Sequence, residues 1–260
     1  MRLKTCLDRQ LGMAFTEEPV NVGEARHTTE RMKLNAVIFD LFGTLVDDFA
    51  SSIGSTNPNL AMALEVPSEP FAQIWRQTTE MRVNGTFQTV EASLEHVCDA
   101  IGVRVSPQKM KKAVEMRLQQ IRRALKPKPD AIATLTQLRG SGYKIGLLSN
   151  CSIEIPILWP ETPLAALFDS VIFSSRERLK KPDPRIYSLA CDRLGVRPEN
   201  CLYIADGENY ELATAAQVGL HPVLIRNHLS KHRPKLFREA EEWKGDSISV
   251  LSEVLLFVGV

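Results

Sequence analysis

Short apolar runs alternate with amphipathic segments from residue 34 onward. The runs are rich in Val, Ile and Leu, and most end at a polar or glycine residue, as strands buried on both faces do. They are Ala36–Phe39, Lys144–Leu148, Val171–Phe173, Cys201–Ala205 and Pro222–Ile225. Helical patterns lie between the later runs, and a last apolar run, Ile248–Val260, should close the core. Strands alternating with helices predict an α/β fold with a doubly wound parallel sheet.

The stretch between the first two runs is far too long for a single crossover. Residues 48–126 show the helical period over 68–81, 89–101 and 107–125. We therefore expect an inserted all-helical domain at 48–126, above the sheet edge where ligands bind in such folds. Residues 34–47 and 127–260 would form the core.

The N-terminal residues 1–33 show neither the strand nor the helix period, which predicts a disordered extension. Met32, just before the first run, is a candidate start.

Composition narrows the classes of partner. Lys and Arg number 32 and Asp and Glu 31, a net charge of +1, which argues against a nucleic-acid or membrane-surface partner. The five cysteines are scattered without a CxxC pair, so neither a disulfide framework nor a zinc site is expected. No apolar run approaches the roughly 20 residues that span a bilayer. A cytoplasmic protein is expected.

Polar side chains follow four of the predicted strands. Asp40 follows the first, Ser149 and Asn150 the second, Lys181 the loop after the third, and Asp206 the fourth. Each residue alone fits a helix cap or a solvated loop. Because a parallel sheet directs its carboxyl ends to one crevice, the four positions together predict a functional site.

The residue types in this set suit nucleophilic chemistry. A carboxylate such as Asp40 can attack an electrophile and form a covalent intermediate. If the electrophile is a phosphoryl group, Mg²⁺ held by Asp40, Asp206 and a backbone carbonyl would remove the repulsion between anions. Lys181 would neutralise charge on the transferring group, and Ser149 would donate to one of its oxygens. Gly43 permits a tight turn after the nucleophile.

Four stretches of the chain resemble the motifs of the haloacid dehalogenase (HAD) superfamily, in order and at suitable spacing. They are Phe39–Asp47, Leu147–Asn150, Lys181–Tyr187, and Tyr203–Gly207 with Glu211. The resemblance covers residues 34 to about 226. It implies a Rossmann-like core, and residues 48–126 are similar in position and helical character to the C1-type cap of that family.

The resemblance also implies roles for individual residues. Asp40 would be the nucleophile, Ser149 a phosphate-binding hydroxyl and Lys181 the charge-stabilising lysine. The Mg²⁺ ligands would be Asp40, the Phe42 carbonyl and Asp206. Glu211 would orient metal-bound water or Lys181 from outside the first layer of ligands.

Further residues are candidates for binding a small phosphorylated substrate. From the core they are Gly43, Thr44 and Asn150, and from the cap Arg76 and Arg82, which could extend down to a substrate.

One position departs from the phosphatases of the superfamily. They usually carry a second aspartate two residues after the nucleophile, where this chain has Phe42. Such an acid–base group contributes roughly 10²–10⁴-fold to a rate. Three alternatives follow: a phosphatase that uses good leaving groups or an acid from the cap, a metal-independent 2-haloacid dehalogenase, or a weak or inactive binding protein.

Two features favour the first alternative. Dehalogenases of the family share the Phe-Gly-Thr turn, but they dispense with Mg²⁺ and their fourth motif opens with neutral residues. This chain has Asp206 and Glu211 there, and without a cation these acids and Asp40 would repel one another. Dehalogenases also place an arginine early in the cap, whereas residues 49–75 contain no Arg or Lys. We therefore expect Mg²⁺-dependent phosphoryl hydrolysis through Asp40.

Overall fold

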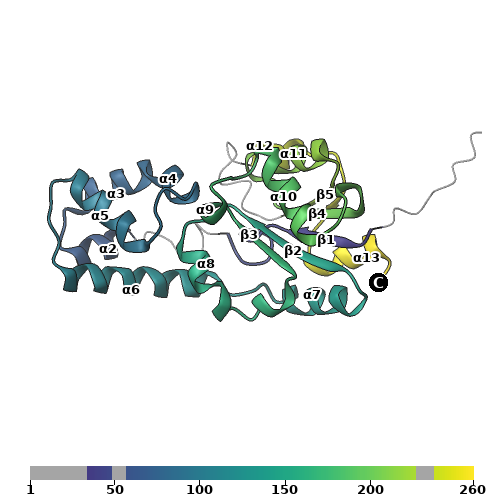
Figure 1. Ribbon diagram of the computed structural model, residues 1–260, viewed down its shortest axis with the longest axis horizontal. Helices are drawn as coiled ribbons and strands as arrows, with labels where there is room; N and C mark the ends of the chain where they lie inside the picture. The colour runs from purple at the N-terminus through teal and green to yellow at the C-terminus, as the bar shows by residue number, and fades with distance from the viewer. Residues whose placement is uncertain (1–33, 49–56, 227–236) are drawn as a thin grey trace, which may run out of the picture. The chain divides into compact units, whose positions relative to one another are not determined.

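The computed structural model describes residues 34–48, 57–226 and 237–260. These residues belong to the second of two units of the chain, Lys33–Val260 (Figure 1). The predictions for residues 1–33, including Met32 as a start, lie outside the described residues. No helix in the described part of the chain is long and apolar enough to cross a membrane.

A six-stranded sheet forms the core, with the strand order β3-β2-β1-β4-β5-β6 and parallel pairing throughout. The strands are β1 (Ala36–Phe39), β2 (Lys144–Ser149), β3 (Ser170–Phe173), β4 (Cys201–Ala205), β5 (His221–Ile225) and β6 (Ser247–Ile248). The predicted doubly wound α/β fold is confirmed, and the five predicted strands lie within one residue of their expected ends.

Both faces of the sheet are covered by helices, which explains why the central strands are apolar at every position. Val37 and Phe39 of β1 pack in one cluster, and Ala36 and Ile38 pack in another on the opposite face. The first cluster includes α7 (Ala131–Gly140) and α13 (Val254–Val258), and the second includes α10 (Pro184–Leu194), α11 (Glu211–Val218) and α12 (Arg238–Glu242). Figure 1 shows these two groups of helices on opposite sides of the strands.

The direction of winding reverses between β1 and β4, which are neighbours in the sheet. In folds of this kind, ligands bind outside the carboxyl ends of the strands at such a reversal. The Asp40 N–H, directly after β1, donates to the Ile204 carbonyl of β4 over 2.9 Å. This bond brings the residues that follow β1 and β4 to the same point.

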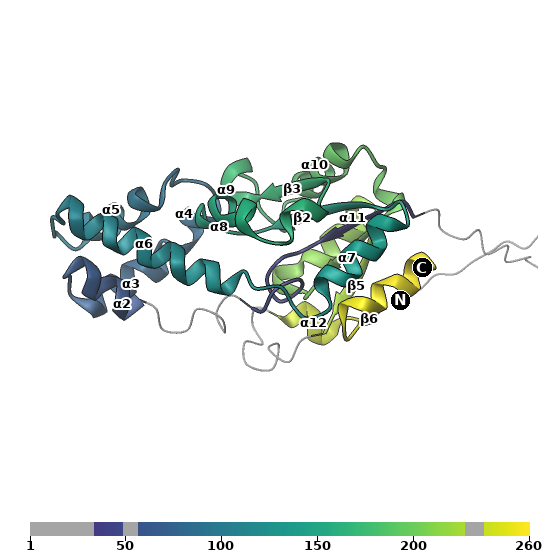
Figure 2. The same cartoon turned by 90° about the horizontal axis from the view of Figure 1, so that it is seen from below.

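The described residues between β1 and α7 form five helices. They are α2 (Asn57–Leu64), α3 (Ser68–Gln77), α4 (Thr79–Val83), α5 (Val90–Ala100) and α6 (Pro107–Ala124). Their apolar side chains form a cluster of their own, with Phe71, Leu94 and Ala113 fully buried. Figure 2 shows α2, α3, α5 and α6 side by side.

The helix expected at 68–81 is in fact two helices that meet at Thr78. The Thr78 hydroxyl donates to the carbonyls of Ile74 and Trp75, which competes with continuation of the helix. Helix α2 was not expected, because its apolar residues do not keep to one face: Leu60 is buried, whereas Met62 is 71% exposed.

Described contacts between this part of the chain and the sheet domain include the following three. Arg117 of α6 pairs with Glu154, which opens α8 (Glu154–Leu158) after β2. The hydroxyl of Ser174, the first residue of α9 (Ser174–Glu177), donates to the Val83 carbonyl over 2.7 Å. Where the chain returns from α6, a β-bridge pairs Val46 with Pro127. The division into a core and a cap at residues 48 and 126 stays a prediction.

Candidate active site

Asp40 lies at the carboxyl end of the central strand β1, with 6% of its surface exposed. The chain then turns back: the N–H groups of Leu45 and Val46 both donate to the Leu41 carbonyl. Gly43 has φ 78° in this turn, a conformation that costs glycine little. The turn therefore leaves the Asp40 carboxylate at the edge where the strands converge.

Lys181 makes direct contact with this carboxylate. Its Nζ donates to Asp40 Oδ1 over 2.6 Å, to Glu211 Oε2 over 2.5 Å and to the Tyr203 hydroxyl over 3.1 Å. Because an ammonium has three N–H donors, all of them are engaged. Burial alone would lower the pKa of Lys181, but the charges of Asp40 and Glu211 outweigh it and raise the pKa, so the lysine stays charged.

Asn150 fixes the backbone of the lysine. Its amide nitrogen donates to the Lys181 carbonyl over 2.9 Å, and its amide oxygen accepts from the Lys181 N–H over 2.8 Å. The structure thus places Asn150 as a support for Lys181, and its predicted contact with the substrate stays a prediction.

Glu211, the first residue of α11, links Lys181 to the loop after β4. Its Oε1 accepts from the N–H groups of Gly207 and Glu208 at 3.2 and 3.1 Å. Its Oε2 accepts from Lys181 and from the Tyr203 hydroxyl, the latter over 2.7 Å. The structure therefore brings Glu211 against Lys181, one of the two contacts that the sequence suggested for it.

Burial disfavours the charged forms of Asp40 and Asp206. Burial raises the pKa of Asp40 to about 6, against the lowering effect of the Lys181 charge. Burial, followed by the charges of Glu211 and Asp40, raises the pKa of Asp206 well above its usual range. A site of this kind retains a proton unless a cation neutralises it.

The oxygen atoms of this site are of the type that Mg²⁺ prefers, namely the carboxylates of Asp40 and Asp206 and the Phe42 carbonyl. Within the described residues, no three His, Cys, Asp or Glu side chains form a group that could hold a metal ion. Magnesium here would therefore need the backbone carbonyl and water in addition to the two carboxylates.

Three neighbouring strands end close to buried hydroxyl groups. Thr44 follows β1, Ser149 ends β2 and Ser175 follows β3, and each is at most 1% exposed. The Thr44 hydroxyl has no hydrogen-bond partner in the part of the chain that the structure describes, whereas the hydroxyls of Ser149 and Ser175 lie beside the weakly bonding Cys151 thiol. An unpaired buried hydroxyl costs about 1–3 kcal/mol, so these groups are suited to the oxygens of a ligand. Ser175 is an addition to the predicted residues.

Two further residues escaped the sequence analysis. Tyr203 is the third acceptor for Lys181. Its position inside the fourth motif was the feature of the sequence that could have identified it. Lys128 donates from Nζ to the Gly43 carbonyl over 2.5 Å. Its distance of 85 residues from Gly43 in the chain hid the relationship.

A family model for haloacid dehalogenase-like hydrolases matches residues 34–219, which contain every residue of this cluster. The chain belongs to that family. This HAD-like hydrolase is 29% identical to (S)-2-haloacid dehalogenase 4A of Burkholderia cepacia over 197 residues, covering 74% of this chain and 83% of the relative. It is 35% identical over 103 residues to a glyceraldehyde 3-phosphate phosphatase of Methanopyrus kandleri, covering 39% of this chain and 44% of the relative.

A solved structure supports the fold of the HAD-like hydrolase. It is the L-2-haloacid dehalogenase of Xanthobacter autotrophicus with chloropropionic acid covalently bound. The TM-score is 0.58 at 21% identity, with 87% of this chain and 98% of that chain covered. At this level of identity the likeness concerns the fold alone.

The two cap arginines of the HAD-like hydrolase lie in different settings. The Arg76 side chain is 64% exposed and lies 3.7 Å from Glu69. Arg82 is buried, donates to the Trp75 carbonyl over 2.7 Å and stacks on the Trp75 ring. Burial and the nearby Arg117 lower the pKa of Arg82 to about 10. The described contacts of both arginines lie within the inserted helices, so their predicted contact with substrate stays a prediction.

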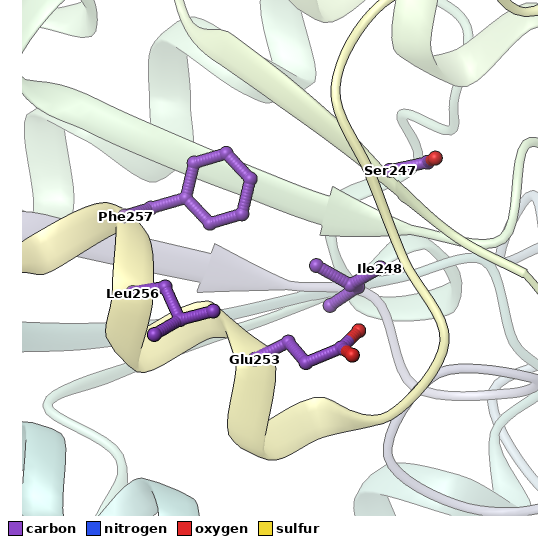
Figure 3. A pocket seen from close by; sticks show the side chains of 5 residues that line it. All are labelled: Ser247, Ile248, Glu253, Leu256 and Phe257. Atoms are coloured by element: carbon purple, nitrogen blue, oxygen red, sulfur yellow. The ribbon is translucent and has the colours of Figure 1, made fainter.

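Figure 3 shows a hollow at the β6 edge of the sheet. The residues that form it are distant in sequence from Asp40. It is lined by Ser247, Ile248, Glu253, Leu256 and Phe257. None of these belongs to the residues that surround Asp40, so the hollow is not the candidate active site.

Proposed function

We propose that this hydrolase forms a covalent intermediate on Asp40, which water then hydrolyses. The contact between Asp40 Oδ1 and the Lys181 ammonium supports the proposal, because a fixed cation favours the ionised, nucleophilic carboxylate. It leaves Oδ2 as the oxygen to attack the substrate. The substrate would be a small molecule, acted on in the cytoplasm.

We further propose that the electrophile is the phosphorus of a phosphate ester. The observation that carries this proposal is the pair of buried carboxyls at Asp40 and Asp206, both with raised pKa values. Asp40, Asp206 and the Phe42 carbonyl would hold Mg²⁺, which when bound supplies positive charge against the phosphoryl oxygens.

The remaining residues have roles that follow from their positions. Asp40 Oδ2 would bond to phosphorus as the bond from phosphorus to the leaving oxygen breaks. The hydroxyls of Thr44 and Ser149 would donate to phosphoryl oxygens, which gives Thr44 a partner that it otherwise lacks and Ser149 a stronger acceptor than the Cys151 thiol. The Phe42 side chain cannot protonate the leaving oxygen, which restricts the reaction to leaving groups of low pKa or to an acid from the substrate or the inserted helices.

The relatives favour the alternative, hydrolysis of a 2-haloacid, over phosphoryl hydrolysis. The match to (S)-2-haloacid dehalogenase 4A extends over 83% of that protein, against 44% of the phosphatase. In this alternative Asp40 Oδ2 would attack carbon 2, the carbon–halogen bond would break, and halide would leave without needing a proton. Phe42 suits that reaction, whereas the buried acidic group of Asp206 favours a bound cation, which that reaction does not use.

One assay separates these proposals. The purified protein is incubated with 4-nitrophenyl phosphate or with (S)-2-chloropropionate, each with Mg²⁺ and with a chelator, and phosphate and chloride are measured. Phosphate release that requires Mg²⁺ supports the phosphoryl reaction, and chloride release in the chelator supports the dehalogenase. Asp40→Asn should abolish either activity while the protein stays folded, and a retained rate would refute the nucleophile. Ligand-dependent thermal stabilisation without turnover would support a binding protein.

A further inference from the structure

Lys128 lies where the chain returns from the inserted helices to the sheet. Pro127 pairs with Val46 in a β-bridge, and the Lys128 N–H donates to the Leu45 carbonyl over 2.9 Å. These contacts hold residue 128 beside the turn that follows Asp40. The position of the Lys128 backbone is therefore set by the same turn that positions the nucleophile.

The half-buried side chain of Lys128 extends over this turn. Its Nζ donates to the Gly43 carbonyl over 2.5 Å, which is its hydrogen-bond acceptor among the described residues. An ammonium has three N–H donors, so two remain for water or a ligand. Lys181 differs, because Asp40, Glu211 and Tyr203 engage all three of its donors.

The electrostatic neighbours of Lys128 are acidic. Burial lowers the pKa of Lys128, and the charges of Asp206, Asp47, Asp130 and Asp40 oppose that effect, with Asp206 the largest of the four. The Gly43 carbonyl to which Lys128 donates lies in the turn that follows Asp40, so the ammonium lies near the carboxylates that would hold Mg²⁺. The energy of Coulomb attraction falls only in inverse proportion to distance, so the ammonium acts on these carboxylates without direct contact.

We propose that Lys128 is a fixed cation of the acidic site, one that partly neutralises Asp206 and Asp40 and weakens the binding of a divalent cation beside them. This inference rests on the proposed metal-binding role of Asp40 and Asp206, but it does not depend on the substrate. The ammonium balances the carboxylates when no metal is bound, and a bound divalent cation is repelled by it. Lys128, in the segment that connects α6 to α7, thus partly determines the affinity of the site for the metal.

The test is direct binding of Mn²⁺, measured by electron paramagnetic resonance of the free ion. Lys128→Met removes the charge and keeps an apolar stem, and Lys128→Gln serves if the first variant does not fold. Lys128→Arg keeps the charge, and Lys126→Met removes an exposed lysine two residues away. Thermal unfolding of each variant establishes that it is folded.

We expect Lys128→Met to bind Mn²⁺ at least about tenfold more tightly than the unchanged protein. Lys128→Arg and Lys126→Met should bind it as the unchanged protein does. Equal affinity in the unchanged protein and Lys128→Met, including no binding by either, would overturn the inference, as would an equal gain in Lys126→Met. Because the measurement needs no turnover, failure of phosphoryl hydrolysis leaves it interpretable.

Discussion

The Nζ of Lys181 lies 2.6 Å from Oδ1 of Asp40, and the two side chains are 5% and 9% exposed. They are 141 residues apart in the chain. A buried charge pair of this kind costs desolvation energy that is recovered only when its remaining donors and acceptors are satisfied. Glu211 and Tyr203 satisfy those of Lys181, which makes the local network a condition for an ionised Asp40.

The charge of Asp40 should make the metal-free protein less stable as the pH rises. The pKa of Asp40 is raised from 3.8 to about 6, so the folded state holds this proton more tightly than the unfolded state does. Asp40 therefore adds to the free energy of unfolding below its pKa in the unfolded chain, and this contribution is lost as the pH rises through about 6. A shift of about two units corresponds to roughly 3 kcal/mol.

Urea denaturation in a chelator from pH 4 to pH 8 measures this loss. Asp40→Asn should be less sensitive to pH over this range than the unchanged protein, and the exposed Asp99→Asn should behave like the unchanged protein. Identical pH profiles for Asp40→Asn and the unchanged protein would contradict the prediction.

Replacing Phe42 by aspartate should raise phosphatase activity on esters with poor leaving groups. The new carboxyl would supply the missing acid, for which general catalysis contributes roughly 10²–10⁴-fold. The control variant is Phe42→Asn, because asparagine has nearly the same size as aspartate but no ionisable group. Steady-state rates with an alkyl phosphate and Mg²⁺ compare the two, and equal rates would exclude loss of the acid as the limit.

Tyr203→Phe should weaken the network without removing a charge. It deletes the hydroxyl that donates to Glu211 and accepts from Lys181. The expected loss of stability is about 1–3 kcal/mol, from two buried hydrogen bonds of the usual strength. Because Lys181 keeps its contacts to Asp40 and Glu211, kcat should fall less than it does in Glu211→Gln. Equal losses of kcat in both variants would show that the hydroxyl matters more than this geometry indicates.

The buried pair of Arg117 and Glu154 should hold the inserted helices to the sheet domain in a way that depends on pH. Burial raises the pKa of Glu154, but the Arg117 charge and hydrogen bonds from Ser152 and Arg117 outweigh it, and the net effect lowers the pKa. A lowered carboxyl pKa stabilises the fold above the unfolded value of 4.5, and this stability is lost as the pH falls through the folded pKa.

Removing one partner of this pair is expected to be costly. Arg117→Met should lose about 3–5 kcal/mol at pH 7, since it leaves an uncompensated buried carboxylate. The double variant with Glu154→Gln should recover part of that loss. Denaturant melts at pH 7 and pH 4 check both statements. Additive losses in the double variant would mean that the two side chains do not interact.

Much of the fold was predictable because the apolar composition of its strands has a simple physical cause. Strands buried on two faces must be apolar throughout, and this made Cys201–Ala205 visible as a unit. Polar residues after such runs then indicated Asp40, Ser149 and Asp206. The same argument indicated Lys181 in the loop after the third strand, and the resemblance of Lys181–Tyr187 to a known motif supported it.

The missed features depend on contacts that have no local pattern. Helix α2 has apolar side chains on more than one face, and the break at Thr78 comes from a hydroxyl that bonds to its own turn. Lys128 joins the site only because a bridge between Val46 and Pro127 returns the chain to the first turn. No periodic pattern of apolar residues in the sequence indicates that the chain comes back to this turn.

The bond from the Asp40 N–H to the Ile204 carbonyl has a consequence for how this protein can change over time. The spacing of Asp40 and Asp206 follows from main-chain bonds between adjacent strands, which residues 57–124 do not contribute. If the inserted helices select the substrate, as proposed, substitutions in them can change that selection while Asp40 and Asp206 keep their spacing. A constant sheet edge combined with variable inserted helices would let related proteins acquire new substrates while the residues that react stay the same.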